Sequence, residues 1–97
     1  MPPVITSFAC KHTQLLFETG KATGFLKIIA KSAKRKLTML HMATTLDDLR
    51  VPPGNRLEPL FGTLLGKHSI RVNDQYRLCF QFKDGSAEKV EIIDYHR

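Results

Sequence analysis

The sequence predicts an α+β fold in which an N-terminal strand and two helices pack on one face of a small, mainly antiparallel, twisted sheet. Apolar side chains recur three or four residues apart across residues 25–42, which is the period of an α-helix. After the loop 51–55 they recur at every second residue, which is the period of a strand. With 97 residues, of which 42% are hydrophobic, the chain has the size and composition of one globular domain, so we expect a single unit over 1–97.

The N-terminal part is predicted to form one strand and two helices. Val4–Phe8 is rich in β-branched and aromatic residues and predicts a short strand. Lys11–Glu18 predicts a short helix that ends at Gly20, because glycine accepts the left-handed conformation of a helix end. Phe25–Met42 predicts a longer helix. Its core-facing stripe consists of apolar residues at helical spacing, namely Leu26, Ile29, Ala30, Ala33, Leu37 and Leu40.

Four strands are predicted in the C-terminal part. Thr45 with Asp48 three residues later resembles a capping box and indicates one more helical turn before the loop. Pro59 lacks a backbone N–H, so the strand that contains it belongs at an edge or a bulge. The predicted strands are Arg56–Leu60, Lys67–Val72, Tyr76–Phe82 and Ala87–Ile93.

The alternation also predicts how these strands pair. A three-residue loop at 73–75 places His68 opposite Phe80, Ile70 opposite Leu78, Val72 opposite Tyr76 and Arg71 opposite Arg77. A three-residue loop at 84–86 pairs Phe80 with Val90 and Leu78 with Ile92. One face of the sheet is then apolar and packs on the helices. The other face carries polar and charged residues, namely Ser69, Arg71, Arg77, Cys79, Gln81, Lys89 and Glu91.

The charge distribution favours a polyanionic partner. Fifteen basic and nine acidic side chains give a net charge of +6, and residues 1–42 alone hold seven basic residues and one acid. Four basic residues lie off the apolar stripe of the second helix and are predicted to contact RNA phosphates, namely Lys27, Lys31, Lys34 and Arg35. The alternative is a solvated, lysine-rich helix without a partner.

Several classes of protein are excluded on composition. The two cysteines and four histidines lack the close spacing of zinc ligands, so we expect no metal, and the small core leaves little room for a cofactor. Cys79 alternates with apolar neighbours in a strand pattern and fits a small buried or half-buried side chain. No apolar run is long enough to span a membrane, so a cytoplasmic protein with no membrane partner is expected.

Arg71 and Arg77 are predicted to lie directly opposite each other, where their charges repel unless an anion lies nearby. Glu91 or Asp94 could supply a structural carboxylate. The functional alternative is a phosphate, for which the planar donor fork of arginine is well suited.

The chain ends with Asp94, Tyr95, His96 and Arg97. An imidazole exchanges protons near neutral pH, a phenol can orient a phosphate oxygen, and arginines stabilise a pentavalent phosphorane. RNA carries its own nucleophile in the 2′-hydroxyl, so such a site needs neither a metal nor a covalent residue. The alternative is a frayed tail without function.

The sequence resembles a known family, the HigB (plasmid-maintenance killer) toxins of the RelE/ParE superfamily. Within this family it is most similar to the GraT-like branch. The resemblance spans essentially the whole chain. It rests on the order of elements and on the segments Ser7-Phe8, Phe17-Glu18-Thr19-Gly20, Pro53-Gly54-Asn55-Arg56-Leu57-Glu58-Pro59-Leu60, residues 68–78 and Asp94-Tyr95-His96. It implies a bacterial type II toxin that cleaves mRNA in the ribosomal A site. It also implies inactivation by HigA, a helix-turn-helix antitoxin, through which alone the toxin would reach operator DNA.

The resemblance also assigns roles to residues of the site. Arg77, Asp94, Tyr95 and His96 match family active-site positions, and Arg71 lies nearby. The sequence departs from the family where a His is often followed three residues later by a Lys. This chain has Glu58 and Phe61 there.

Two functional hypotheses of different classes follow, beside a third in which the chain is a small, non-toxic RNA-binding module. In the first, a ribosome-dependent endoribonuclease binds RNA through its basic helices, Arg56, Arg71 and Arg77, while His96 and Glu58 exchange protons. In the second, the same fold blocks a target without cleavage, as the ParE branch does with DNA gyrase. Arg71, Arg77 and the Asp-Tyr-His end favour the first, whereas Glu58 and Phe61 favour the second.

Overall fold

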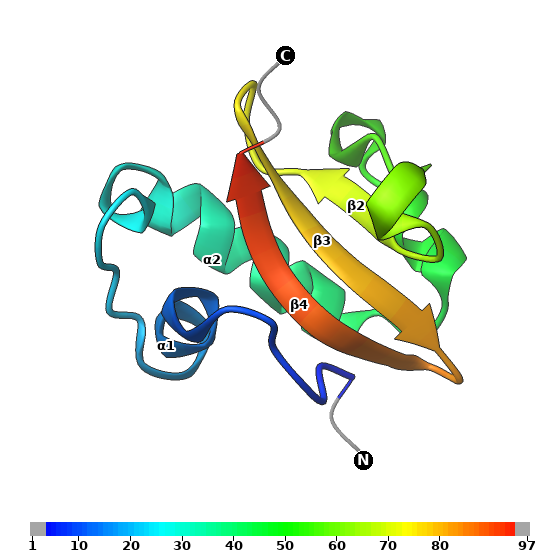
Figure 1. Ribbon diagram of the computed structural model, residues 1–97, viewed down its shortest axis with the longest axis horizontal. Coiled ribbons are helices and arrows are strands. Elements are labelled where there is room, and N and C mark those ends of the chain that lie inside the picture. Colours follow the sequence, from blue (N-terminus) through cyan, green and yellow to red (C-terminus); the bar gives the residue numbers. More distant parts are fainter. Residues whose placement is uncertain (1–3, 95–97) are drawn as a thin grey trace.

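The computed structural model describes residues 4–94 and has the α+β architecture that the sequence predicts. Two helices, α1 (Lys11–Thr19) and α2 (Leu26–Met42), precede a four-stranded sheet (Figure 1). Short 3₁₀ helices lie at Leu46–Arg50, Pro53–Asn55 and Gly62–Leu64. The strands are β1 (Glu58–Pro59), β2 (His68–Arg71), β3 (Tyr76–Lys83) and β4 (Ser86–Asp94).

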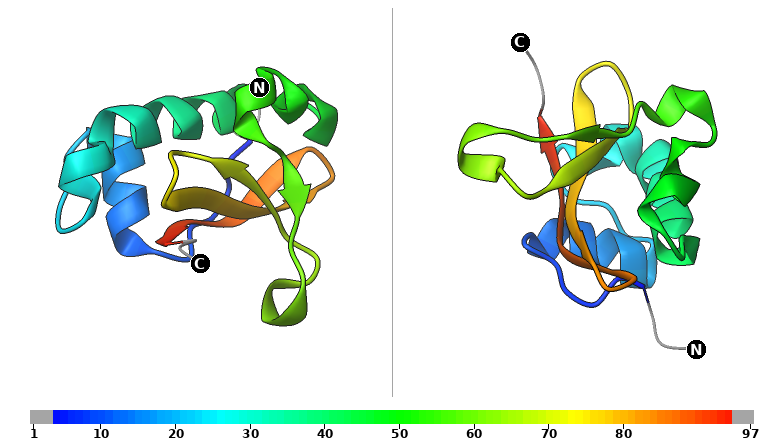
Figure 2. Two further views of the ribbon diagram at one scale, coloured as in Figure 1. Left: turned by 90° about the horizontal axis from the view of Figure 1, so that it is seen from above. Right: turned by 90° about the vertical axis from the view of Figure 1, so that its right-hand side faces the viewer.

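The sheet has the order β1-β2-β3-β4, and each neighbouring pair is antiparallel. Figure 2 shows α2 lying across one face of this sheet, with α1 beside it. The stripe of α2 that faces the sheet is buried, as its helical spacing predicts, except for Ala30, which is only partly buried. It consists of Leu26, Ile29, Ala33, Leu37 and Leu40, and it meets a buried sheet face of Ile70, Leu78, Phe80, Val90 and Ile92.

The pairing of β2 with β3 matches the prediction. His68 pairs with Phe80, Ile70 with Leu78 and Arg71 with Arg77. The Val72 N–H donates to the Tyr76 carbonyl at 3.0 Å, which closes the predicted three-residue turn. The polar face of this hairpin therefore carries both arginines.

The pairing of β3 with β4 corrects the prediction near the second hairpin. The turn has two residues, Asp84 and Gly85, whose positive φ angles of 52° and 78° suit a tight hairpin. A bulge between Cys79 and Gln81 restores the predicted pairing of Leu78 with Ile92. The predicted pairing of Phe80 with Val90 falls within this bulge and is lost, although both side chains remain in the core.

The predicted first strand is reduced to two isolated parallel bridges to β4, Ile5–Ala87 and Phe8–Val90. Its ladder is interrupted where Lys89, with a φ of 53°, bulges out of β4. The Ser7 hydroxyl accepts the Lys89 N–H at 2.9 Å, and the Ser7 carbonyl accepts the Val90 N–H at 3.1 Å. Residues 4–8 therefore follow the edge of β4 without forming a regular strand.

The predicted strand at Arg56–Leu60 is shortened to β1, which has two residues at the sheet edge. Arg56 has a φ of 47°, which regular strand backbone does not adopt, and Pro59 supplies no N–H. The predicted capping turn is confirmed, because the Asp48 carboxylate accepts the Thr45 N–H at 3.1 Å. Hydrogen bonds to Thr44 and Thr45 lower the pKa of Asp48.

Candidate active site

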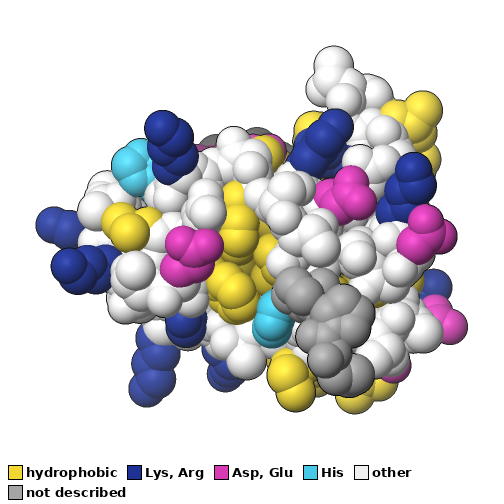
Figure 3. All heavy atoms as spheres, turned by 90° about the horizontal axis from the view of Figure 1, so that it is seen from below, with side chains coloured by type: hydrophobic (Ala, Val, Ile, Leu, Met, Phe, Trp, Pro, Cys, Tyr) yellow, Lys and Arg dark blue, Asp and Glu magenta, His cyan; other side chains and the backbone are white. Residues whose placement is uncertain are grey.

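The basic residues of the N-terminal half gather at one end of the molecule. Figure 3 shows mainly Lys and Arg side chains, with an acidic side chain among them, over α1 and the start of α2, whereas acidic and basic side chains mix more evenly at the opposite end. Lys27, Lys31 and Arg35 are exposed on α2, as predicted for phosphate-contacting residues. Lys34 differs, because its Nζ donates to the Phe17 carbonyl at 2.6 Å and lies 5.3 Å from the centroid of the Phe17 ring. In this structure Lys34 therefore ties α2 to the end of α1.

Arg77 is almost enclosed, with only 7% of the residue exposed. Its Nε donates to the Ser69 hydroxyl at 2.7 Å, and its Nη2 donates to the backbone carbonyls of Ser69 and Arg56. The Glu58 carboxylate lies 3.7 Å from Nε. Arg77 therefore joins β3, β2 and the loop before β1 through one guanidinium.

The loop that supplies the Arg56 carbonyl is held by a buried polar pair. The Lys36 ammonium of α2 donates to the Asn55 side-chain oxygen, and the Asn55 amide donates to the Leu49 carbonyl at 3.1 Å. Burial is the main cause that lowers the pKa of Lys36, with Arg35 and Arg71 adding repulsion. Asn55 is fully buried, so its bonds fix the backbone conformation that leads into Arg56.

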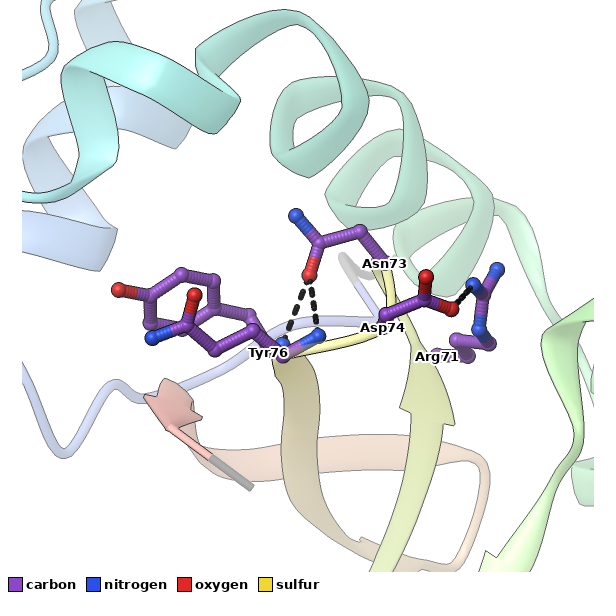
Figure 4. Close-up of polar contacts among 5 residues, drawn as sticks. Arg71, Asn73, Asp74 and Tyr76 are labelled. Carbon is purple, nitrogen blue, oxygen red and sulfur yellow. Dashed lines mark hydrogen bonds and ion pairs between the residues drawn. The ribbon is translucent and has the colours of Figure 1, made fainter. Parts of the chain in front are cut away.

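Arg71 lies opposite Arg77 on the sheet but has a carboxylate of its own. Its Nη2 forms an ion pair with Asp74 in the turn between β2 and β3 (Figure 4). In the same turn, the Asn73 side-chain oxygen accepts the N–H groups of Gln75 and Tyr76, both at 2.8 Å. Each arginine of the pair thus has a carboxylate close by, Asp74 for Arg71 and Glu58 for Arg77. The sequence had suggested Glu91 or Asp94 for this role.

Asp94 ends β4 and is exposed, and it pairs across the sheet with Tyr76. Its Oδ2 accepts the Gln75 side-chain amide at 3.1 Å. The predicted catalytic residues Tyr95 and His96 lie outside the described residues. Arg56, predicted to contact RNA, is exposed at the bend before β1.

Cys79 is buried, which agrees with the prediction of a buried or half-buried side chain, and the charged groups Glu91, Arg77 and Lys67 act on it. Burial, with a smaller contribution from Glu91, raises the pKa of its thiol to about 12. A thiol with such a pKa is almost wholly protonated at neutral pH and does not act as a nucleophile.

Within residues 4–94, no three His, Cys, Asp or Glu side chains come together as they would around a metal ion. The same residues include no helix that is both long and apolar enough to cross a membrane.

Comparison with known proteins places this site in a family. A family model described as a RelE-like toxin of the type II toxin–antitoxin system HigB matches residues 6–96. The chain belongs to this family of HigB-like toxins.

Two curated members of the family illustrate the relationship. Toxin HigB-1 of Vibrio cholerae is 60% identical over 53 residues, which make up 55% of this chain and 56% of that protein. The chain thus aligns with little more than half the length of that relative. Endoribonuclease HigB of Proteus vulgaris is 33% identical over 93 residues, which cover 96% of this chain and 100% of that protein.

Solved structures show the same fold at lower identity. Escherichia coli YafQ has a TM-score of 0.62 at 18% identity and covers 94% of this chain and 91% of its own. A chain of the YoeB–YefM complex from Staphylococcus aureus has a TM-score of 0.60 at 18% identity, with 100% of both chains covered. The HigB-like toxin described here therefore has the RelE-like toxin fold.

Sequence reasoning missed the groups that hold Arg77 in place. The sequence assigned Ser69 to the polar face of the sheet. It gave no sign that the Ser69 hydroxyl binds Arg77 on the neighbouring strand. Arg56, whose carbonyl Arg77 binds, has a left-handed backbone conformation. Glycine or asparagine usually occupies such a position, so an arginine there gave no signal. The Lys36–Asn55 pair joins residues nineteen positions apart, a separation at which periodicity carries no information about polar contacts.

Proposed function

We propose that this HigB-like toxin is an endoribonuclease that needs no metal and cleaves mRNA on the ribosome, thereby inhibiting translation. The observation that carries the proposal is the alignment over 96% of the chain with the Proteus vulgaris protein, whose name is endoribonuclease. We further propose that residues 1–97 act as one toxin domain in the cytoplasm, where ribosomes are found.

The chemistry proposed for the site is an internal attack of the RNA 2′-hydroxyl on the adjacent phosphorus. Glu58 and His96 would take the proton from the 2′-oxygen and deliver one to the departing 5′-oxygen. Arg77 and Arg71 would stabilise the charge that develops on the phosphorane, with Tyr95 donating to it and Asp94 orienting the neighbouring groups. Arg77 suits this role because Ser69 and the Arg56 carbonyl hold it in one orientation before substrate arrives.

The exposed basic residues of α2 support the proposal that RNA binds at the helical end. Lys27, Lys31 and Arg35 are open to solvent, and Glu18 is the only acid among residues 1–42. Such a face attracts phosphates by long-range electrostatics and by release of counterions.

The expected protein partner is a HigA-like helix-turn-helix antitoxin that inactivates the toxin and carries it to operator DNA. The family is defined by a toxin–antitoxin system, and a structure with the same fold is titled a YoeB–YefM complex. The toxin itself would then make no operator contact of its own.

The second candidate is a toxin of the same fold that blocks the ribosome or gyrase by binding alone. One observation favours it, because Phe61 is 75% exposed at the position where the family resemblance leads one to expect a lysine. An exposed phenyl ring binds protein or base surfaces but cannot neutralise a phosphate.

A reconstituted translation reaction separates the two candidates. Primer extension on the mRNA should reveal new 5′ ends when the full chain and ribosomes are both present, and none when ribosomes are omitted. Equal cutting of free mRNA would contradict the requirement for ribosomes. Halted translation on intact mRNA would identify a blocking toxin instead.

A further inference from the structure

Two aromatic rings stack where the start of α2 meets the start of β3. Phe25 and Tyr76 have ring centroids 5.1 Å apart and planes inclined by 22°. Tyr76 pairs across the sheet with Asp94, and Figure 4 shows its ring beside the end of β4. The stack therefore lies next to the strand end that leads into the proposed catalytic residues.

The outer ring of this stack is open to solvent. Phe25 is 40% exposed, and Ile28, one helical turn further along α2, is 91% exposed. Packing of α2 on the sheet accounts for the contact between the two rings, but it does not account for the apolar surface turned outward. Exposed apolar surface of this kind often marks a binding site.

The exposed aromatic ring continues into a basic stripe. Phe25, Ile28, Lys31 and Arg35 follow one another at intervals of three, three and four residues, so they share one side of α2. We call these four residues the Phe25 stripe. It extends over about 15 Å, given a rise of about 1.5 Å per residue. Both basic side chains in it are exposed.

An aromatic face that continues into cations is the arrangement with which proteins bind unpaired nucleotides. Any base can stack on the ring, while Lys and Arg contact the backbone phosphates. An acidic protein would be attracted by the same charges, but it presents a planar ring only where an aromatic side chain lies, whereas every unpaired nucleotide presents one beside its phosphate.

We propose that the Phe25 stripe is a stacking subsite for an unpaired base of the RNA strand that the toxin cleaves. Phe25 contacts the base, Tyr76 supports the ring from behind, and Lys31 and Arg35 contact the phosphates that follow. The proposal rests on the proposed function, and it assigns the cleaved strand because the stack adjoins Asp94 at the end of β4.

The loop that carries Phe25 is already held in place before RNA binds. The His12 ring nitrogen Nδ1 lies 2.7 Å from the Thr23 hydroxyl, and the Leu26 N–H donates to the Thr23 carbonyl at 3.2 Å. A preorganised ring loses little conformational entropy on binding, which favours stacking as a source of affinity.

The test uses a short single-stranded oligonucleotide with 2′-O-methyl groups throughout and one 2-aminopurine base. It cannot be cleaved by the 2′-hydroxyl route, and 2-aminopurine fluorescence falls when the base stacks. Titration with the full chain should quench the fluorescence. Phe25→Leu keeps an apolar contact with Tyr76 but removes the aromatic face, so it should weaken binding about tenfold or more and reduce the quench. Phe25→Trp should retain both.

A control variant and the uncleavable strand make the result specific. Leu65→Ala removes an apolar side chain that is 74% exposed in another loop, and it should bind like the wild type. The 2′-O-methyl strand cannot be cut, so its binding and quench report the subsite independently of cleavage, and the subsite stands even if cleavage by the full chain is never seen. Unchanged affinity and quench in Phe25→Leu, or no quench with the wild type, would overturn the proposal. A loss of antitoxin binding alone would assign the stripe to a protein partner and overturn it equally.

Discussion

Arg77 and Glu58 form an ion pair of unequal partners, with Arg77 Nε 3.7 Å from Glu58 Oε1. The Arg77 side chain is 8% exposed, whereas the Glu58 side chain is 41% exposed. Water screens a carboxylate that is this open, so the pair adds at most about 1 kcal/mol to stability. Ser69 and the Arg56 carbonyl hold the arginine in place, which leaves Glu58 accessible for chemistry at the same guanidinium.

Glu58→Gln should therefore separate stability from activity. We expect the free energy of unfolding to change by less than about 1 kcal/mol, because a weak, solvated pair is lost. Cleavage should slow by about 10²-fold to 10⁴-fold if Glu58 transfers a proton. Urea unfolding and single-turnover cleavage of ribosome-bound mRNA measure the two quantities. Faster cleavage would show instead that Glu58 competes with the phosphate for Arg77.

Leu78→Asp should unfold the domain. Leu78 is fully buried in β3 and pairs with Ile70 on one side and Ile92 on the other. A carboxylate at this position loses its hydration without gaining a partner, at a cost comparable to the roughly 5–15 kcal/mol that stabilises a domain. Circular dichroism and thermal unfolding check this. Leu78→Met, which nearly conserves volume, should cost less than about 1.5 kcal/mol.

The Cys79 thiol should make the protein less stable at alkaline pH. Burial raises its pKa from 9.0 to about 12, so between these values the folded chain keeps a proton that the unfolded chain has released. Stability contributed by the protonated thiol is thus fully present below pH 9 and is lost as the pH rises toward 12.

Paired urea titrations of wild type and Cys79→Ala, with a reductant present, test this expectation. The variant should be less stable at pH 7 because it leaves a small cavity, and this deficit should shrink steadily above pH 9. Cys10→Ala controls for oxidation of thiols. A deficit that stays constant from pH 7 to pH 11 would contradict the buried, protonated thiol.

The basic residues of α2 should fall into two functional groups. Replacing the exposed Lys27, Lys31 and Arg35 by Gln should weaken ribosome binding and flatten its dependence on salt by about two units of slope, because each phosphate contact releases counterions. Lys34→Met should instead destabilise the fold by about 1 kcal/mol, since its ammonium bonds to the Phe17 carbonyl. Ribosome binding measured across a series of salt concentrations, together with urea unfolding, distinguishes the two groups of residues. An unchanged salt slope in the triple variant would rule out α2 as the docking face.

The fold could be predicted from the sequence wherever one side of an element is buried. The stripe of α2 and the alternation of β2 and β3 each have a single arrangement that hides their apolar side chains, so the pairing of Arg71 with Arg77 follows from Ile70 and Leu78. For the hairpin between β3 and β4, burial of apolar side chains did not determine the pairing. A two-residue turn with a bulge at Lys89 buries the same side chains as a three-residue turn without one, so the pattern could not choose between them.

The candidate site could be predicted less well than the fold, because its geometry depends on single polar contacts. Arg77 and Glu58 could be chosen as candidates from their residue types. Nothing in the neighbouring sequence indicates that Arg56 adopts a left-handed conformation and that its carbonyl accepts a hydrogen bond from Arg77. Lys34 and Lys31 look alike in the sequence. Only the position of the end of α1 beneath α2 gives Lys34 a carbonyl to bind.

The measurement that tests the central claim most directly maps mRNA 5′ ends in a translation reaction with the full chain, with His96→Ala, and with a chain lacking residues 95–97. Within residues 4–94, the hydrophobic core is built from side chains of both helices, the sheet and the loops that join them. The shortened chain should therefore fold and still bind ribosomes, while its cuts disappear and those of His96→Ala slow by about 10²-fold or more. Growth inhibition by the folded, shortened chain, with no cuts from the full chain, would contradict the account.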